Sequence, residues 1–354
     1  MHIYEYLFAG LILIAILLAS SMIAATMPNP QLSVSEKEDV KTEAEKIMTQ
    51  ILLDPGQPYN WGSDTSIDQT KLTGFGLAKY GESTREAYVL DPDNVQRLDS
   101  DNAGALYIPP NTTATLLNLA GEYGFTLEIH PVLNVTKSET STSKYTVTVT
   151  SEYQTIPIVN ARINSTLFYY NSGGIINSAT AANSTGFDGR CILDFSSGSL
   201  DIQTGMLTIT VNYLGIHTVK NYPIGSHLEQ AFLIGNNILL RSNSSIVSTN
   251  ITEVITTKQS DQYVISSFNS TASNNGPQDY QLAFDEPTMF MVLAPSSDYQ
   301  TLIYASRNVD LIYSTIPQLA SSTASPLLSY TLERTAMIGD TAYTVSLMLW
   351  RMSF

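Results

Sequence analysis

The sequence has few charged residues, one cysteine and no recognisable catalytic motif. Each of these shortages excludes some classes of protein. Only 14% of the residues are charged, well below the quarter that is usual for a soluble domain. Cys191 is the single cysteine, so no disulfide forms within the chain and stability must come from packed cores. The hydrophobic content of 43% is sufficient for such cores, in about two or three domains.

Basic residues are also scarce. Lys and Arg together number 17, against 32 Asp and Glu, which gives a net charge of −15. A protein that binds nucleic acid needs clustered basic side chains to neutralise phosphates, so nucleic acid is not expected as a partner. The same balance argues against an anionic membrane surface and is compatible with a cation-rich cell surface.

Residues that usually carry chemistry are few and scattered. Cys191 lies in an alternating apolar segment, so we expect a small buried hydrophobe rather than a nucleophile. No G-x-S-x-G elbow, Walker sequence or dinucleotide-binding loop occurs. We therefore expect a protein that is not an enzyme, with no catalytic residue, no cofactor and no resident metal. The histidines lack a second His or Cys at ligand spacing; they are His2, His130, His217 and His227.

Two groups of residues allow a ligand interpretation beside a structural one. An acidic group offers hard oxygen ligands for calcium, but it does not match the standard calcium-binding loop, so we interpret it as caps and turns. Trp61 with Tyr59 allows a sugar-stacking face, although a Trp beside a turn more often fills a core. The acidic group comprises Asp91, Asp93, Asp99 and Asp101.

The uncharged run at residues 7–27 is the longest apolar segment of the sequence. At about 1.5 Å per residue, a helix of this length spans roughly 30 Å, the thickness of a bilayer's hydrocarbon core. A cleaved signal needs a basic n-region and a shorter core, yet the first basic residue is Lys37. Ala19-Ser20-Ser21 keeps cleavage open as the alternative. We expect residues 1–30 to be a retained transmembrane helix, with the lipid bilayer as partner and the remainder outside the cell.

Residues 31–132 have the pattern of a small α+β unit. Ser35 and Glu38 form a capping box, and apolar residues then recur at helical spacing as far as Leu52. Asp91-Pro92 predicts the start of a short helix that runs to about Leu98. The alternation at 125–129 predicts a strand with one buried face. We expect one long helix laid on a short sheet.

The rest of the chain has the pattern of β-structure. A polar, linker-like stretch at 134–144 precedes short strands at regular spacing, with Gly and Asn turns, which predict a β-sandwich at 133–223. Residues 224–354 predict a C-terminal β-rich domain that ends in a hairpin around Gly339-Asp340. Alternatively, the sandwich is inserted in a split domain, with the strands near Phe125 and Trp350 in one sheet.

Glu5, at the edge of the apolar run, has two interpretations. One places it at headgroup level between interfacial Tyr4 and Tyr6. The other is a resemblance, because a Glu at the fifth position of an apolar N-terminal helix resembles mature type IV pilins. That resemblance implies a pairing of Glu5 with the N-terminal amine of a neighbouring subunit during assembly. The basic leader that a prepilin peptidase cuts is not in this sequence, so either it has been trimmed or the resemblance is confined to the anchor.

Scattered motifs extend the resemblance to archaeal envelope proteins related to type IV pilins. Pro28 and Pro30 depart from the unbroken pilin helix. The runs at 157–163 and 185–191 resemble bacterial and archaeal immunoglobulin-like surface modules. The pilin-related motifs are Leu52-Leu53-Asp54-Pro55-Gly56 with Asn60-Trp61, Leu90-Asp91-Pro92, and Leu349-Trp350-Arg351.

The resemblances imply two functions from different classes. The first is a pilin-like subunit or minor pilin of a cell-surface filament, assembled from its own copies or with other pilin-like subunits. The second is a membrane-anchored adhesion protein that does not polymerise and binds glycans or surface partners. Seven Asn-x-Ser/Thr sequons permit N-glycosylation of an exported protein. They begin at Asn111, Asn134, Asn164, Asn183, Asn243, Asn250 and Asn269.

Overall fold

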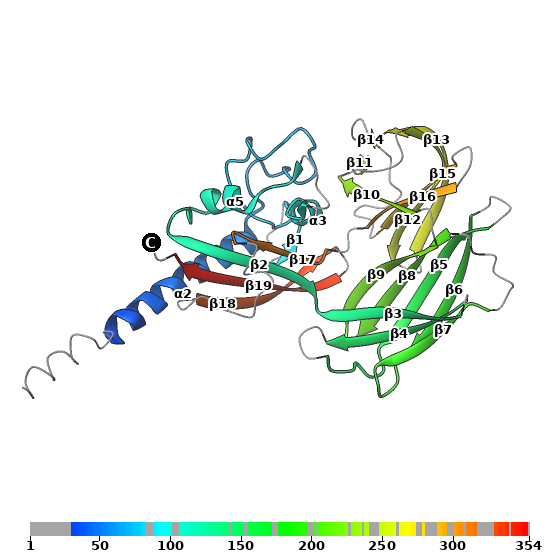
Figure 1. The fold of residues 1–354 in the computed structure, drawn as a ribbon, viewed down its shortest axis with the longest axis horizontal. Helices are drawn as coiled ribbons and strands as arrows, with labels where there is room; N and C mark the ends of the chain where they lie inside the picture. The colour runs from blue at the N-terminus through cyan, green and yellow to red at the C-terminus, as the bar shows by residue number, and fades with distance from the viewer. Residues whose placement is uncertain are drawn as a thin grey trace, which may run out of the picture.

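A computed structural model of the chain shows a mainly β protein with largely antiparallel sheets and, among the described residues, one long helix (Figure 1). The expected transmembrane run and Glu5 lie outside the described residues. Within the described part of the chain, no helix is both long and apolar enough to cross a bilayer. The structure describes residues 30–352 except 82–87, 101–105, 142, 152–154, 172–175, 197–201, 203, 226–227, 236, 241–247, 260–261, 274–277, 280–288, 296–299, 307–308, 317–328 and 340.

The long helix, α2 (Pro30–Leu53), buries one stripe of apolar residues against a sheet. Val40, Ala44, Ile47 and Ile51 recur every three or four positions and are almost fully buried. Their spacing confirms the predicted helical face. The predicted start was wrong, because the helix already includes Pro30 and Ser35 lies inside it rather than at its N-cap.

The sheet under α2 brings together strands from distant parts of the sequence. Phe125 pairs with Leu349 and Gly124 with Trp350, so the prediction that these segments share a sheet is confirmed. A side chain at Gly124 would lie 2.5 Å from the Trp350 ring, so only glycine fits there. The strand order is β1 (Val89–Leu90), β18 (Ser329–Ile338), β19 (Thr341–Arg351), β2 (Tyr123–Pro131) and β17 (Leu311–Ser314).

Two of the described helices are short and belong to this helix-on-sheet unit. Asp91 caps α3 (Pro92–Gln96) by accepting a hydrogen bond from the Asp93 amide at 2.8 Å, which confirms the predicted helix start. The helix ends at Gln96, two residues earlier than expected. The second helix, α5 (Pro110–Leu116), begins with Pro at its first position, where no N–H is required.

The predicted C-terminal hairpin is confirmed. Strands β18 and β19 pair from Ser329↔Trp350 to Ile338↔Thr341, and Gly339 has a φ of +56°, as a tight primed turn requires. The hairpin places β19 at the centre of the sheet, where it is buried on both faces over most of its length.

Two sheets pack face to face as a β-sandwich between residues 133 and 225 (Figure 1). Their facing side chains, including Val147, Ile163, Leu193 and Leu207, form one core. The linker expected at 134–144 is instead mostly a strand, because Val135 is buried in this core and residues 133–141 pair with β4. The sheets are β3 (Leu133–Ser141), β4 (Lys144–Ser151) and β7 (Arg190–Asp194), against β6 (Ile176–Ser184), β5 (Arg162–Tyr170), β8 (Thr204–Tyr213) and β9 (Ile216–Gly225).

A third sheet follows before the chain returns to the first. Its strands pair antiparallel except β10 with β16, which run parallel. In sheet order they are β13 (Gln262–Ser273), β12 (Ser248–Gln259), β15 (Met289–Pro295), β16 (Gln300–Ser306), β10 (Leu228–Ile234), β11 (Asn237–Leu240) and β14 (Gln278–Asp279).

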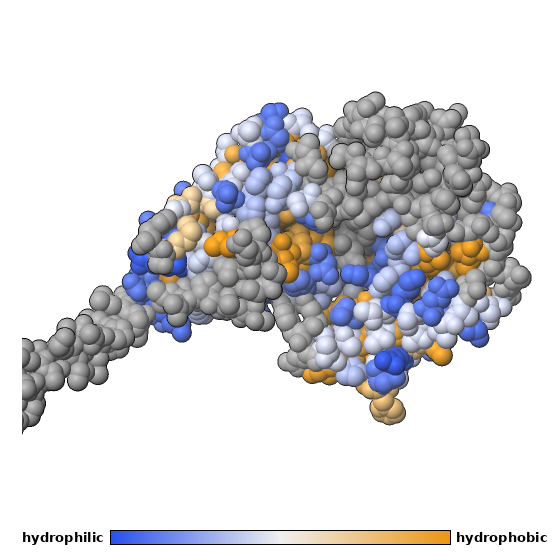
Figure 2. Space-filling model, in the orientation of Figure 1, coloured by the Kyte–Doolittle hydropathy of each residue, from blue (hydrophilic) through white to orange (hydrophobic). Residues whose placement is uncertain are grey.

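In the sequence, the sandwich and the third sheet are therefore inserted between β2 and β17, two strands that pair with each other in the first sheet. The expected C-terminal domain at 224–354 is divided in the structure. Its strands β17, β18 and β19 belong to the sheet and the core of the helix-on-sheet unit, and its earlier strands form the third sheet. Among the coloured residues of the sandwich seen in Figure 2, the hydrophobic residues form small patches separated by more hydrophilic residues.

Candidate binding site along strand β17

Among the strands that the structure describes, β17 lies at the end of the order of the first sheet, next to β2. The amide of Thr315 donates to the Phe125 carbonyl at 3.0 Å, which fixes the register of the ladder. Since hydrogen-bonded pairs alternate in an antiparallel ladder, Leu311 and Tyr313 direct their backbone groups toward β2. The N–H and C=O groups of the residues between them, such as Ile312, therefore point away from β2.

A groove with a volume of about 440 Å³ runs along this edge. It touches five consecutive residues of the chain, 310–314. Successive side chains of a strand point to opposite faces, so a groove that touches all five lies along the strand edge rather than over one face. The opposite wall comes from described residues that follow α3 and from the first residue of α5. It is formed by Leu98, Asp99, Ser100, Tyr107 and Pro110.

Hydrogen bonds fix this opposite wall to the sheet. The buried hydroxyl of Tyr313 donates to the Ile108 carbonyl at 2.9 Å and lies 2.7 Å from the Thr113 hydroxyl. Burial raises the pKa of Tyr313, so it remains protonated and able to donate. Burial and the nearby charge of Asp99 also raise the pKa of Tyr107. The lining of the groove thus includes an aromatic ring, that of Tyr107, and a carboxylate, that of Asp99.

Arg97 holds the start of the same segment. Its side chain is fully buried, and its guanidinium donates to the carbonyls of Trp61, Ile67 and Leu106. Its Cζ atom lies 5.4 Å from the centroid of the Trp61 ring. Burial lowers the pKa of Arg97 to about 10, against the attraction of the carboxylates of Asp68 and other residues, so the group stays charged at neutral pH.

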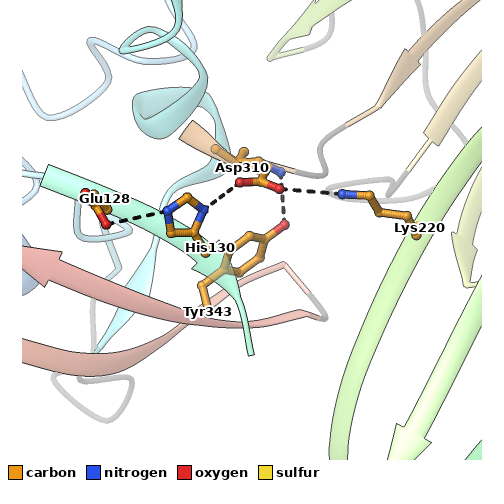
Figure 3. A network of polar contacts seen from close by, with 6 residues as sticks. Glu128, His130, Lys220, Asp310 and Tyr343 are labelled. Atoms are coloured by element: carbon orange, nitrogen blue, oxygen red, sulfur yellow. Dashed lines mark hydrogen bonds and ion pairs between the residues drawn. The ribbon is translucent and has the colours of Figure 1, made fainter. Parts of the chain in front are cut away.

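A polar network lies at one end of the groove, where the first unit meets the sandwich. Figure 3 shows His130 between two carboxylates: its Nδ1 is 2.6 Å from Asp310 and its Nε2 is 3.8 Å from Glu128. Lys220, from sandwich strand β9, lies 3.8 Å from the other oxygen of Asp310. The hydrogen bond from His130, helped by the charge of Lys220, lowers the pKa of Asp310.

Further hydrogen bonds join the same parts of the molecule. The amide of Val309 donates to the Tyr343 hydroxyl at 2.9 Å, and the amide of Val219 donates to the Thr341 hydroxyl at 3.2 Å. Strand β9 of the sandwich is therefore tied both to the segment that leads into β17 and to the C-terminal hairpin. The network positions the sandwich against the groove end.

The sequence-predicted acidic group is divided between separate roles. Asp91 caps α3, and buried Asp93 accepts a hydrogen bond from the Gly235 amide at 3.0 Å. Asp99 lines the groove, and Asp101 lies outside the described residues. Among the residues that the structure describes, no group of three or more His, Cys, Asp and Glu is placed to hold a metal.

Trp61 fills the core, as the structural interpretation predicted. Its side chain is fully buried and donates to the Pro55 carbonyl at 2.8 Å, so the sugar-stacking alternative is wrong for this residue. Tyr59 instead stacks on Tyr80, with ring centroids 4.1 Å apart, and each ring is about half exposed. The sequence offered no signal for this pair. Cys191 is buried, which raises the pKa of its thiol to about 11.

The sequons have different exposures. Asn111, Asn134 and Asn183 are exposed and Asn164 is half-buried. Asn183 also donates a hydrogen bond to the Ile192 carbonyl at 2.8 Å. For the other three, the side chains lie outside the described part; these are Asn243, Asn250 on β12 and Asn269 on β13.

Comparison with known proteins gives no family assignment. A scan against protein-family models found none that matches this chain, and a search of curated proteins found no similar protein.

Proposed function

We propose that the chain is a structural surface protein, a pilin-like subunit or minor pilin of an extracellular filament. One observation carries the proposal. Helix α2 lays its apolar face on an antiparallel sheet, and the C-terminal hairpin forms the centre of that sheet. In the sequence, α2 follows closely on the apolar run at 7–27. A helix laid on a short sheet behind an apolar N-terminus is what the resemblance to archaeal type IV pilin-like proteins implies.

The sandwich supports a surface role in the same proposal. With strands β3 to β9 lettered A, B, C, C′, E, F and G, the two sheets have the orders A-B-E and C′-C-F-G. Immunoglobulin-like sandwiches divide their strands between two sheets in this way. We infer an immunoglobulin-like module, inserted in the helix-on-sheet unit and presented outside the cell.

The test of the structural role is Glu5→Gln in cells that express the full chain. In a filament, the change removes the partner of a neighbour's amine in a low-dielectric bundle, and breaking such a pair costs about 3–5 kcal/mol. We expect a sharp fall in the amount of protein in sheared filaments at equal membrane expression. Glu139→Gln is the matched control, because it removes the same charge from an exposed position of the sandwich and should leave the filament yield unchanged. An unchanged filament yield for Glu5→Gln would refute the assembly role.

A second candidate function is a membrane-anchored protein that binds glycans without polymerising. The stacked and half-exposed rings of Tyr59 and Tyr80 favour it, because an exposed aromatic face packs well against the apolar face of a sugar ring. The test is glycan-array binding of the full chain. Tyr59→Ala and Tyr80→Ala should each abolish binding, whereas Tyr88→Ala, at a tyrosine with 40% exposure, should leave it unchanged.

A further inference from the structure

The sequons differ in whether both of their functional side chains are accessible in the folded chain. N-glycosylation uses the asparagine carboxamide as the acceptor, and the transferase also binds the hydroxyl at the third position of the sequon. A transferase that acts on a folded protein must therefore reach both side chains from the same side. The structure describes both side chains for four sequons, those that begin at Asn111, Asn134, Asn164 and Asn183.

The sequon at Asn134 presents both side chains to solvent. It lies on β3, where successive side chains point to opposite faces, so Asn134 and Thr136 share one face. Both residues are exposed, whereas Val135 between them is buried in the core of the sandwich. Residues two apart in a strand are separated by about 6.5 Å. The carboxamide and the hydroxyl are therefore accessible together, from one side of the sheet.

The sequon at Asn111 presents only its asparagine. It lies in helix α5, where each residue turns the chain by about 100°, so side chains two apart point to nearly opposite sides. Asn111 is accordingly exposed, whereas Thr113 is fully buried with its hydroxyl 2.7 Å from that of Tyr313. A transferase reaches this hydroxyl only if the contact between α5 and β17 opens.

The other two sequons are built into the sandwich. Asn164 is half-buried on β5, and Thr166, the third residue of its sequon, is fully buried. Asn183 is exposed, but its carboxamide donates to the Ile192 carbonyl of β7 at 2.8 Å and so joins the two sheets. Its third residue, Thr185, is buried, and its hydroxyl makes hydrogen bonds to the segment that leads into β5. Neither sequon offers an accessible hydroxyl to an enzyme.

We propose that Asn134 is the N-glycan acceptor among these four sequons, and that the other three remain unmodified. The reaction joins Nδ2 of Asn134 to the anomeric carbon of a saccharide carried on a lipid phosphate. The C–N bond forms, the C–O bond to the lipid phosphate breaks, the lipid phosphate leaves, and Nδ2 loses one proton. The proposal rests on the surface role proposed above, because an exported chain meets a transferase and a lipid-linked donor at the membrane that it crosses.

The experiment is glycopeptide mass spectrometry of the full chain, isolated from the cells that express it naturally. Cleavage after glutamate places Asn134 in the peptide Ile129–Glu139, apart from Asn111. We expect a saccharide on most copies of Asn134 and none on Asn111, Asn164 or Asn183. Transfer to an unfolded chain would depend on the sequence of each sequon alone. Equal occupancy of the four sequons would therefore overturn the selection of Asn134 by the fold.

Fractionation of the same cells separates this proposal from the surface role on which it rests. A chain found at the cell surface with Asn134 unmodified would overturn the acceptor and leave the surface role in place. A chain retained inside the cell without any saccharide would refute both.

Variants on one face of β3 test the requirement for the two side chains. Asn134→Gln and Thr136→Ala should each remove the saccharide, whereas Thr136→Ser, which keeps a hydroxyl, should retain it. Ser138→Ala is the matched control, because Ser138 is exposed on the same face and lies outside the sequon. Thermal unfolding should be nearly unchanged in all four variants, since the altered side chains are exposed. A saccharide retained at Asn134 in Thr136→Ala would overturn the distinction between Asn134 and Asn111.

Discussion

The helix-on-sheet unit and the sandwich differ in how far apart in the sequence the segments that form their cores lie. The core of the first unit joins α2 and β2 to β18 and β19, from the two ends of the described chain. The core of the sandwich comes from one continuous stretch, and its neighbouring strands are mostly close in sequence. The first unit therefore needs long-range contacts to complete its sheet, whereas more of the strand pairs in the sandwich are local hairpins.

The two regions also bury different polar groups. In the described part of the sandwich, the buried polar side chains are hydroxyls such as Ser165, Thr166 and Thr208. The first unit buries the charged group of Arg97 and the polar residues of α3. Hydroxyl groups find backbone partners within one sheet, but a guanidinium needs several carbonyls from separate segments. The first unit is thus more sensitive to the loss of a single polar side chain.

The largest expected effect is that of Arg97→Ala. This change leaves three buried carbonyls, those of Trp61, Ile67 and Leu106, without their donor. The expected loss is about 3–5 kcal/mol of unfolding free energy, confined to the first unit. Hydrogen exchange resolved by segment measures it. Arg162→Ala, at an exposed arginine of the sandwich, should change little. A uniform loss of protection in both regions would contradict the comparison.

The next largest effects are expected from shortening one buried leucine in the core of each region. Leu347→Ala on β19 and Leu207→Ala on β8 each remove a fully buried side chain, one from each core. Each should cost about 2–5 kcal/mol. In urea unfolding followed by segment-resolved exchange, each variant should lower the midpoint of its own region much more than that of the other. If both variants lower both midpoints equally, the two regions unfold as one unit.

Acid should weaken the junction between the regions. The pKa of Asp310 is lowered in the folded state, so its contribution is complete above its unfolded pKa and is lost as pH falls through the folded value. The difference in unfolding free energy between wild type and Asp310→Asn should therefore be present at neutral pH and shrink below about pH 4. Urea titrations across this pH range measure it. A difference that grows in acid would show that His130, Glu128 or Lys220 controls the junction instead.

The smallest effect concerns a turn of the sandwich. Leu214, between β8 and β9, has a φ of +52° and is 86% exposed, and Gly215 follows it at +84°. A left-handed conformation costs an ordinary side chain about 1–2 kcal/mol, and asparagine tolerates it better. Leu214→Asn should raise the stability of the sandwich by about 0.5–1 kcal/mol. A thermal shift of the sandwich transition measures the gain, and Leu214→Ala, which keeps the strain, should not reproduce it.

The sandwich strands and the terminal hairpin were predictable because alternation and turn residues are local signals. The burial of Val147 and the turn at Gly339 follow from neighbours in the sequence. The site was not predictable in this way. His130 and Asp310 meet across 180 positions of the sequence, and no local pattern marks either residue as the other's partner. Strand β17 has only four residues, so its pattern was too short to predict a strand there.

The insertion of two modules between β2 and β17 sets an order of events as the chain leaves the ribosome. Helix α2 and strand β2 emerge before the two modules, whereas their central neighbour β19 is the last of the described strands to be made. The sandwich folds while the apolar stripe of α2 still waits for its sheet. A chain stopped before Ser329 would hold a folded sandwich beside an unfinished first unit. The sheet that covers α2 is therefore completed only after the hairpin of β18 and β19 has been made.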